Sequence, residues 1–283
     1  MVTYRAVLDV DPDVVSAIEN VVATRRSEIG SPWRALTSFD QAVLYLVWVR
    51  HDFTFAELGA HFGISTDRAW AYATETMNVL ARQAPDLAEG LRAAGPERHA
   101  VLEGTLISTD RCTSTPVGYD GTNQDPYYSG KHHRHGVNVE GVIGLDGELL
   151  YLGEACCGST HDTAAARADG IIQAAKNTDV ELIADLGYHG ADGTVRTPVK
   201  RRAGRGLSPR DQRANREHAR VRCQGERGFA QLKVFKVLRR VRISPSRITA
   251  LTRSIHTVIR LETFLPMARI EGPGGQAGVL PGL

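Results

Sequence analysis

Four acidic side chains stand where a carboxylate can bind a metal ion or transfer a proton. Glu103 and Asp110 lie in "HAVLEGTLISTDRC", a stretch otherwise apolar enough for a buried strand. Asp185 ends the apolar run "VELIAD", and Glu226 lies in "RCQGERGFAQLK". Carboxylate oxygens are the ligands that Mg²⁺ prefers, and they also serve as general acids and bases. The elements that carry these four acids therefore decide where chemistry can occur.

Asp185 is the strongest single candidate. The run 180–185 is short and almost wholly apolar, which is typical of a central strand covered on both faces. Sheets of α/β proteins present their sites beyond the carboxyl ends of such strands. The alternative is that Asp185 caps the following turn, in "LGYHG".

Glu226 belongs to a predicted helix. Arg222, Glu226, Phe229 and Lys233 are spaced by four, three and four residues, which places them on one helical stripe. Such a Glu is either an ion-pair partner or a metal ligand whose cationic neighbours bind phosphate. The residues alone favour the ion pair.

Glu103 and Asp110 cannot both join such a site. In a regular strand they are separated by roughly 23 Å and point to opposite faces, because the spacing of seven is odd. Glu103 precedes Gly104, which allows a close approach of backbone or substrate. Asp110 lies at the end of the strand, where a side chain can be exposed to solvent. At most one of them belongs with Asp185 and Glu226.

Two further stretches carry polar chemistry. "YYSGKHHRHG", residues 127–136, holds three histidines together with Lys131 and Arg134. A zinc site there lacks a fourth ligand at suitable spacing, so a loop that binds a partner through its cations and Tyr rings is favoured. His161 and Asp162 open a predicted helix in "GSTHD". Capping is the alternative for Asp162, and an accessory role facing the site is considered for His161.

The charge is unevenly distributed. The whole chain carries +2, but residues 196–247 contain 17 Lys and Arg against 3 acids, a net of +14. This block predicts a polyanion partner, with a solvated surface as the alternative. The four cysteines form no CxxC pair, no secretion signal is visible and no apolar run reaches membrane-span length, so we expect a cytoplasmic protein.

The order of predicted elements gives two domains and a tail. Residues 1–95 read as helical, and the Gly63 turn between two short helices is typical of a helix-turn-helix whose second helix exposes Arg68. Residues 96–268 follow as three strands, a helix over 160–177, the strand 180–185 and helices near 208–240 and 244–265. That order predicts an α/β fold, a mixed sheet with helices packed on it. Residues 269–283, rich in Gly and Pro, are expected to be a disordered tail.

Five phrases together resemble the DDE transposases of bacterial insertion sequences, in the branch akin to the eukaryotic Harbinger endonucleases. They are "EGTLISTDR", "YYSGKHHRHGVNV", "GSTHDTAAAR", "IADLGYHGA" and "NREHARVRCQGERGFAQLK". The resemblance implies a ribonuclease-H-like fold that binds element ends, cleaves DNA strands and transfers them to target DNA. It also implies a nucleoid-associated homo-oligomer and two divalent ions, Mg²⁺ or Mn²⁺. The three acids of the family correspond to Glu103, Asp185 and Glu226.

The same resemblance assigns a DNA-binding surface. Arg222 and Lys233 match the cations of the family signature and are expected beside the scissile phosphate. The basic stretch would hold the DNA backbone with a salt-dependent affinity. The expected phosphate-binding residues are Arg222, Lys233, Lys131, Arg134, Lys200, Arg201, Arg202 and Arg68.

Two departures from the family pattern leave alternatives open. The first acid is Glu103 where the family has Asp, and the signature's Tyr is Ala219. The longer side chain moves the carboxylate by more than about 1 Å, which metal-centred catalysis tolerates poorly. The hypothesis is that Glu103 is the first ligand and activity is reduced, with Asp110 as the alternative. A nuclease of this fold without transposition and an inactive DNA-binding relative are the competing functions.

Overall fold

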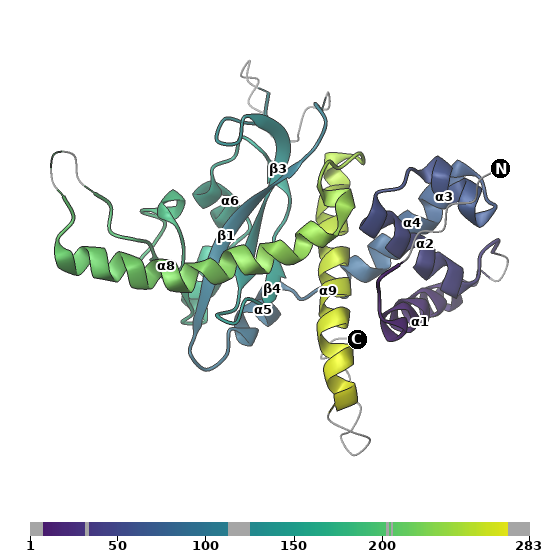
Figure 1. The fold of residues 1–283 in the computed structure, drawn as a ribbon, viewed down its shortest axis with the longest axis horizontal. Coiled ribbons are helices and arrows are strands. Elements are labelled where there is room, and N and C mark those ends of the chain that lie inside the picture. Colours follow the sequence, from purple (N-terminus) through teal and green to yellow (C-terminus); the bar gives the residue numbers. More distant parts are fainter. Residues whose placement is uncertain (1–7, 32–33, 113–124, 202–203, 205, 271–283) are drawn as a thin grey trace. The chain divides into compact units, whose positions relative to one another are not determined.

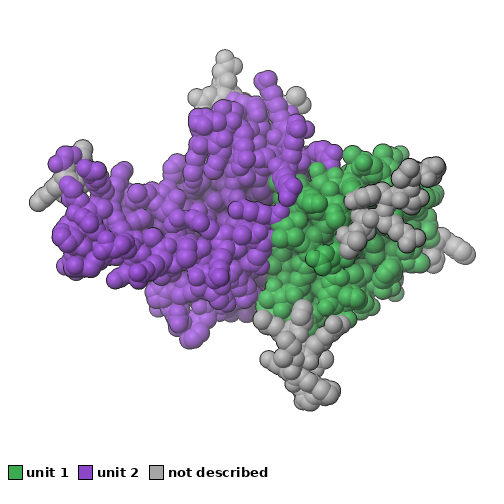
Figure 2. All heavy atoms as spheres, viewed as in Figure 1, with its two compact units in different colours: residues 1–84, 234–238, 250–283 green, residues 85–233, 239–249 purple. Residues whose placement is uncertain are grey.

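The structure, a computed structural model, describes the chain except residues 1–7, 32–33, 113–124, 202–203, 205 and 271–283, with backbone alone for 266–270. Arg202 and most of the predicted tail 269–283 therefore lie outside the described residues. Two compact units are present (Figure 2). Unit 1 comprises residues 1–84, 234–238 and 250–283, and unit 2 comprises residues 85–233 and 239–249.

Unit 1 is helical. Its helices are α1 (Pro12–Glu28), α2 (Ser38–His51), α3 (Phe55–Phe62), α4 (Thr66–Ala81), the 3₁₀ turn η3 (Lys236–Leu238) and most of α9 (Ile248–Ile270). Gly63 ends α3 with φ +67°, and the Ser65 side chain caps α4 by accepting from the Arg68 backbone N–H. This is the predicted helix-turn-helix, and Arg68 is exposed on its second helix.

Unit 2 is built on a mixed sheet. The strands are β1 (His99–Ser108), β2 (Tyr128–Ser129), β3 (Arg134–Ile143), β4 (Leu149–Leu152), β5 (Cys156–Cys157), β6 (Glu181–Ile183) and β7 (Val195–Arg196). The order is β2-β3-β1-β6-β7, with β4 and β5 also paired to β3. β1 is antiparallel to β3 and parallel to β6. The predicted strand "VELIAD" is therefore central, between β1 and β7.

Helices cover both faces of this sheet. Leu102 of β1 is buried with residues of α5 (Leu87–Ala93), α6 (Asp162–Ala168) and α7 (Ile171–Asn177). Its neighbours Val101 and Glu103 point to the other face, where α8 (Pro209–Ala230) crosses the sheet (Figure 1). The remaining turns are η1 (Leu186–Tyr188), η2 (Gln231–Val234) and η4 (Pro245–Arg247). The predicted ribonuclease-H-like α/β fold, preceded by helix-turn-helix helices, is confirmed.

Three predicted bounds differ from the structure. The helix expected over 160–177 is broken by Gly170, which has φ +77°. The helix expected to reach 240 ends at Ala230, and the "QLKVFKVL" that follows forms η2 and η3. Compact unit 2 begins at residue 85 and excludes residues 250–268, whereas the predicted second domain spans 96–268. The predicted functional division into these domains stays a prediction.

Candidate active site beside the central strands

Two acids are brought together by strand register. β1 and β6 run parallel with Val101 beside Ile183. Glu103 and Asp185 each lie two residues beyond this last pair, Glu103 on β1 and Asp185 as the N-cap of η1. The Asp185 carboxylate accepts a 2.7 Å hydrogen bond from the Gly187 N–H, which is the turn-capping role considered from the sequence. Asp185 therefore caps the turn and also lies within electrostatic range of Glu103.

The helix α8 supplies the third acid and approaches the sheet unusually closely. A Cβ added to Gly225 would lie 2.8 Å from Val101 Cγ1 and 3.3 Å from Glu103 Oε2. One added to Gly228 would lie 2.7 Å from Ile143 Cγ1. Because neither glycine has a side chain, the helix packs directly against β1 and β3. This packing holds Glu226 and Arg222 over Glu103.

Arg222 bridges two of the acids. Its guanidinium donates to Glu103 Oε2 at 2.9 Å and to Glu226 Oε1 at 3.2 Å. The Glu103 side chain is 20% exposed and that of Glu226 is 69% exposed. Burial raises the pKa of Glu103, Arg222 opposes this shift, and the charges of Asp185 and Glu226 add to it. Glu103, Asp185 and Glu226 thus lie within electrostatic range of one another.

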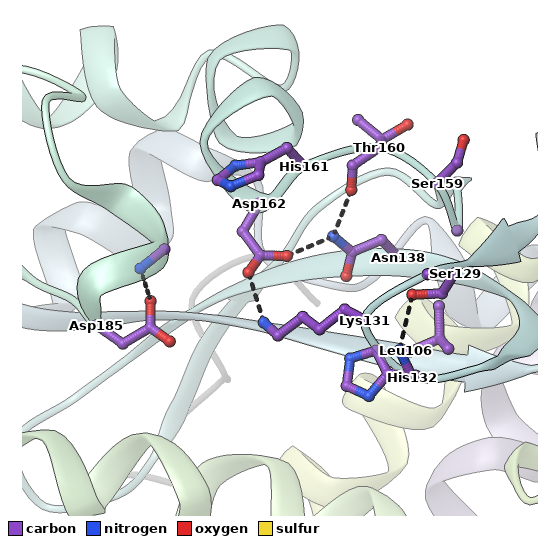
Figure 3. A pocket seen from close by; sticks show the side chains of 13 residues that line it. Leu106, Ser129, Lys131, His132, Asn138, Ser159, Thr160, His161, Asp162 and Asp185 are labelled. Atoms are coloured by element: carbon purple, nitrogen blue, oxygen red, sulfur yellow. Dashed lines mark hydrogen bonds and ion pairs between the residues drawn. The ribbon is translucent and has the colours of Figure 1, made fainter.

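A cavity of about 400 Å³ opens beside Asp185 (Figure 3). Lys131 enters it from the loop before β3 and donates to Asp162 Oδ2 at 2.8 Å. Asn138 of β3 donates to the other oxygen of Asp162 at 3.0 Å. From the sequence, capping is one role expected for Asp162, and a site-facing role is considered for His161. His161 is the residue that caps α6, while Asp162 lies in the polar network of the cavity.

Behind this cavity lies a buried acid that sequence reasoning missed. Glu140 of β3 is 1% exposed and accepts a hydrogen bond from the Tyr188 hydroxyl. Burial raises the pKa of Glu140 to about 8, and the charge of Asp162 adds to the shift. Asn138 donates to the same carboxylate at 3.3 Å. The signal in the sequence was an acid inside the otherwise apolar strand "VNVEGVI".

A second missed residue ties α8 to the strand that carries Asp185. His218 is 8% exposed, and its Nε2–H donates to the Ala184 carbonyl at 2.8 Å. His218 lies four residues before Arg222 on the inner stripe of α8. This bond therefore sets the position of the arginine relative to Asp185.

Other predicted residues lie elsewhere. Asp110 is beyond the end of β1, half exposed, and pairs with Arg240. Lys233 lies exposed in η2, so the predicted stripe through Lys233 does not continue on one helix. Three more predicted phosphate-binding residues of unit 2 are exposed on its surface: Arg134, Lys200 and Arg201. The geometry groups Glu103, not Asp110, with Asp185 and Glu226.

The acidic side chains of the site have the right type of donor atom for a divalent cation. All are oxygen donors of the type that Mg²⁺ and Mn²⁺ prefer. Within the described residues, however, no three His, Cys, Asp or Glu side chains are close enough to hold one metal ion. Arg222 holds Glu103 and Glu226, and Lys131 holds Asp162. Two of the three predicted metal ligands, Glu103 and Glu226, are therefore paired with a cation of the protein itself.

Two general features accompany the site. All four cysteines, Cys112, Cys156, Cys157 and Cys223, are free thiols. Over the part of the chain that the structure describes, no helix combines the length and apolarity needed to cross a membrane.

Comparisons with known proteins agree with this geometry. Residues 102–262 match the family described as DDE superfamily endonuclease, and residues 34–86 match the helix-turn-helix of DDE superfamily endonuclease. The chain is 27% identical over 215 residues to a protein of Streptomyces albus G, the "Putative transposase for insertion sequence element IS112", covering 76% of this chain and 75% of that protein. No solved structure matches it. The first match spans more than half of the chain, so the protein belongs to the DDE superfamily endonuclease family.

Proposed function

We propose that the protein is the transposase of an insertion sequence, which binds the ends of its element, cleaves DNA strands and transfers them to target DNA. The observation that carries this proposal is the grouping of Glu103, Asp185 and Glu226 where β1, β6 and α8 meet. The likeness to the putative transposase of Streptomyces albus G supports it. The Harbinger-like branch, a homo-oligomeric active complex and a bacterial cytoplasmic, nucleoid-associated location belong to the same proposal.

Glu103, Asp185 and Glu226 would hold two divalent ions, Mg²⁺ or Mn²⁺. When bound, such ions activate the attacking oxygen and stabilise the leaving oxygen of the phosphodiester. The side chains of this chain then have simpler tasks. The Gly187 N–H fixes the orientation of Asp185, and Asn138 fixes that of Asp162. Arg222 and Lys131 carry the positive charge that a phosphate beside these acids needs.

The DNA backbone would be held by exposed cations of unit 2. Arg213, Arg216 and Arg220 lie exposed at spacings of three and four on α8, so they form one ridge. Asn215 ties the segment before Lys200 to the same helix, with hydrogen bonds of 2.8 and 3.1 Å to the backbone of Val199. Contacts between these cations and DNA phosphates would not depend on the base sequence. Readout of the element ends would fall to the helix-turn-helix, whose second helix exposes Arg68.

A second candidate rests on the Glu103–Arg222 contact. A longer first acid held at 2.9 Å by an arginine is a poorer metal ligand than the Asp of the family. The protein would then bind element ends while cutting slowly or not at all. A nuclease of this fold without strand transfer is the third alternative.

The experiment uses a duplex ending in the terminal repeat that flanks this gene, incubated with the purified full-length protein and Mg²⁺. The proposed transposase gives nicked strands and, with added target DNA, joined products. Nicking without joined products supports the nuclease, and binding without nicking in Mg²⁺ or Mn²⁺ supports the DNA-binding relative. The absence of binding to this duplex relative to a scrambled one would overturn the proposal.

A further inference from the structure

Lys131 is seated among acids rather than at the protein surface alone. Its ammonium is 2.8 Å from Asp162 Oδ2. The hydrogen bond to Asp162 raises the pKa of Lys131, and the charges of Asp185 and Glu103 add to this shift. The ammonium therefore contacts the Asp162 carboxylate and lies within electrostatic range of those of Asp185 and Glu103. Figure 3 shows the side chain extended into the cavity toward Asp162.

The acids around this ammonium are held in place by the protein. A methyl group added to Gly187 would lie 2.8 Å from Asp185 Oδ1 and 3.2 Å from Asp162 Oδ2, so both carboxylates reach the same point. Asn138 donates to the Oδ1 of Asp162 and leaves Oδ2 to Lys131. Asp162 cannot turn away from the cavity without losing the Asn138 bond.

Arg222 is paired with Glu103 and Glu226 in the same way that Lys131 is paired with Asp162. It donates one hydrogen bond to Glu103 and another to Glu226. Lys131 and Arg222 are the two cations of the site that were expected to bind DNA phosphate. In this state both are paired with carboxylates instead.

We propose that Lys131 and Arg222 act as internal counter-ions that a divalent metal must displace, so that metal binding releases them to DNA phosphate. The inference rests on the proposed function, because it concerns the same metal site. A divalent ion held by Glu103, Asp185 and Glu226 would compete with Arg222 for carboxylate oxygens of Glu103 and Glu226. The same ion would repel the nearby Lys131 ammonium through like charge. Each cation that leaves becomes available to a phosphate oxygen.

The exchange makes metal and DNA binding mutually favourable. Without metal, the two cations must break carboxylate contacts before they bind phosphate. With metal bound, the carboxylate contacts of the two cations are already broken, so DNA binding no longer has to break them. Because binding couplings are reciprocal, DNA must raise the metal affinity by the same factor.

The test measures Mn²⁺ binding by the full-length protein, without DNA, by electron paramagnetic resonance titration. Lys131→Met removes the competing ammonium and should tighten Mn²⁺ binding by roughly three- to tenfold, a modest factor because Lys131 is more than half exposed. The matched control is Lys176→Met. Lys176 pairs with Asp192 at 3.6 Å, away from the acids of the site, and its variant should bind Mn²⁺ as the wild type does.

A measurement on the unaltered chain covers the case in which Lys131→Met does not fold. Amine acetylation followed by peptide mass spectrometry should modify Lys131 faster at saturating Mn²⁺, while the rate at Lys176 stays constant. An unchanged rate at Lys131, or Lys131→Met binding Mn²⁺ no more tightly than wild type, overturns the inference. If either of these two results is obtained and the wild-type protein still nicks DNA with Mn²⁺, the proposed function stands. Only the counter-ion role of Lys131 and Arg222 is then lost.

Discussion

Arg222 of α8 donates a 2.9 Å hydrogen bond to Glu103 of β1, across 119 residues of sequence. The same guanidinium reaches Glu226 one helical turn further on, at 3.2 Å. This contact joins the helix that carries the third acid to the strand that carries the first. It also determines what a change at Glu103 should do.

Glu103→Asp should increase the rate of DNA nicking. The shorter side chain withdraws the carboxylate from Arg222 and restores the geometry of the family's first acid. Misplacements of about 1 Å cost up to roughly 100-fold in rate, so we expect a gain of about tenfold or more in single-turnover nicking with Mg²⁺. Asp110→Ala, which removes the partner of Arg240, should nick within about twofold of wild type. No gain from Glu103→Asp together with loss of nicking in Asp110→Ala would transfer the role to Asp110.

Gly225→Ala should destabilise unit 2 although alanine favours helices. The helical preference gains about 1 kcal/mol, but the new methyl group would lie 2.8 Å from Val101 Cγ1, and such overpacking costs about 1–3 kcal/mol. We expect a net loss of about 1 kcal/mol in urea denaturation, with slower nicking because Glu103 is displaced. Gly193→Ala, where a Cβ meets nothing within 4 Å, is the control and should unfold as wild type does. Equal stability of Gly225→Ala and wild type would show that α8 is less tightly packed.

Glu140→Gln should change how stability depends on pH. The pKa of Glu140 is about 8 in the folded chain and near 4.5 when unfolded, so the folded state binds the extra proton between these values. Wild-type stability therefore falls as pH rises from about 4.5 to 8, whereas the glutamine variant lacks this loss. Between pH 5 and pH 8, the free energy of unfolding of the variant relative to wild type should rise by roughly 2–4 kcal/mol in urea titrations. A pH-independent difference would mean that Glu140 is ionised in the folded chain.

The ridge of arginines on α8 should set the salt dependence of DNA binding. Each phosphate contact contributes about 0.9 to the slope of log affinity against log salt. Replacing Arg213, Arg216 and Arg220 by Gln should therefore lower the slope by roughly 2 to 3 in fluorescence anisotropy with non-specific duplex DNA. Arg92→Gln, an exposed arginine of α5, should leave the slope unchanged. A triple variant with the wild-type slope would place the DNA on another surface.

Much of the fold follows from local patterns. The apolar run before Asp185 predicted a central strand, and β6 lies between β1 and β7. Two of the three bounds that differ concern helices, and each has its own local cause. Gly170 adopts φ +77° and breaks a helix that its neighbours favour. After Ala230 the apolar residues of "QLKVFKVL" pack as short 3₁₀ turns rather than as a continued helix.

The sequence predicted the acids of the candidate site, which stay a prediction, but not the partners that the structure gives to the side chains around them. Glu103, Asp185 and Glu226 were found from strand ends, helix spacing and family resemblance. The Lys131–Asp162 pair, the Glu140–Tyr188 hydrogen bond and the His218–Ala184 hydrogen bond were not, because each joins residues at least 31 positions apart. The folding of helices and loops onto the sheet of unit 2 brings these partners together.

The most direct test of the central claim compares Asp185→Asn with Asp110→Asn in nicking of end-containing DNA with Mg²⁺. The amide keeps the size of the side chain but loses the charge that holds a divalent ion. The account predicts that Asp185→Asn loses nicking by about 100-fold or more while still binding the duplex, and that Asp110→Asn keeps it. Nicking by Asp185→Asn at the wild-type rate would contradict the claim that these carboxylates form the cleavage site.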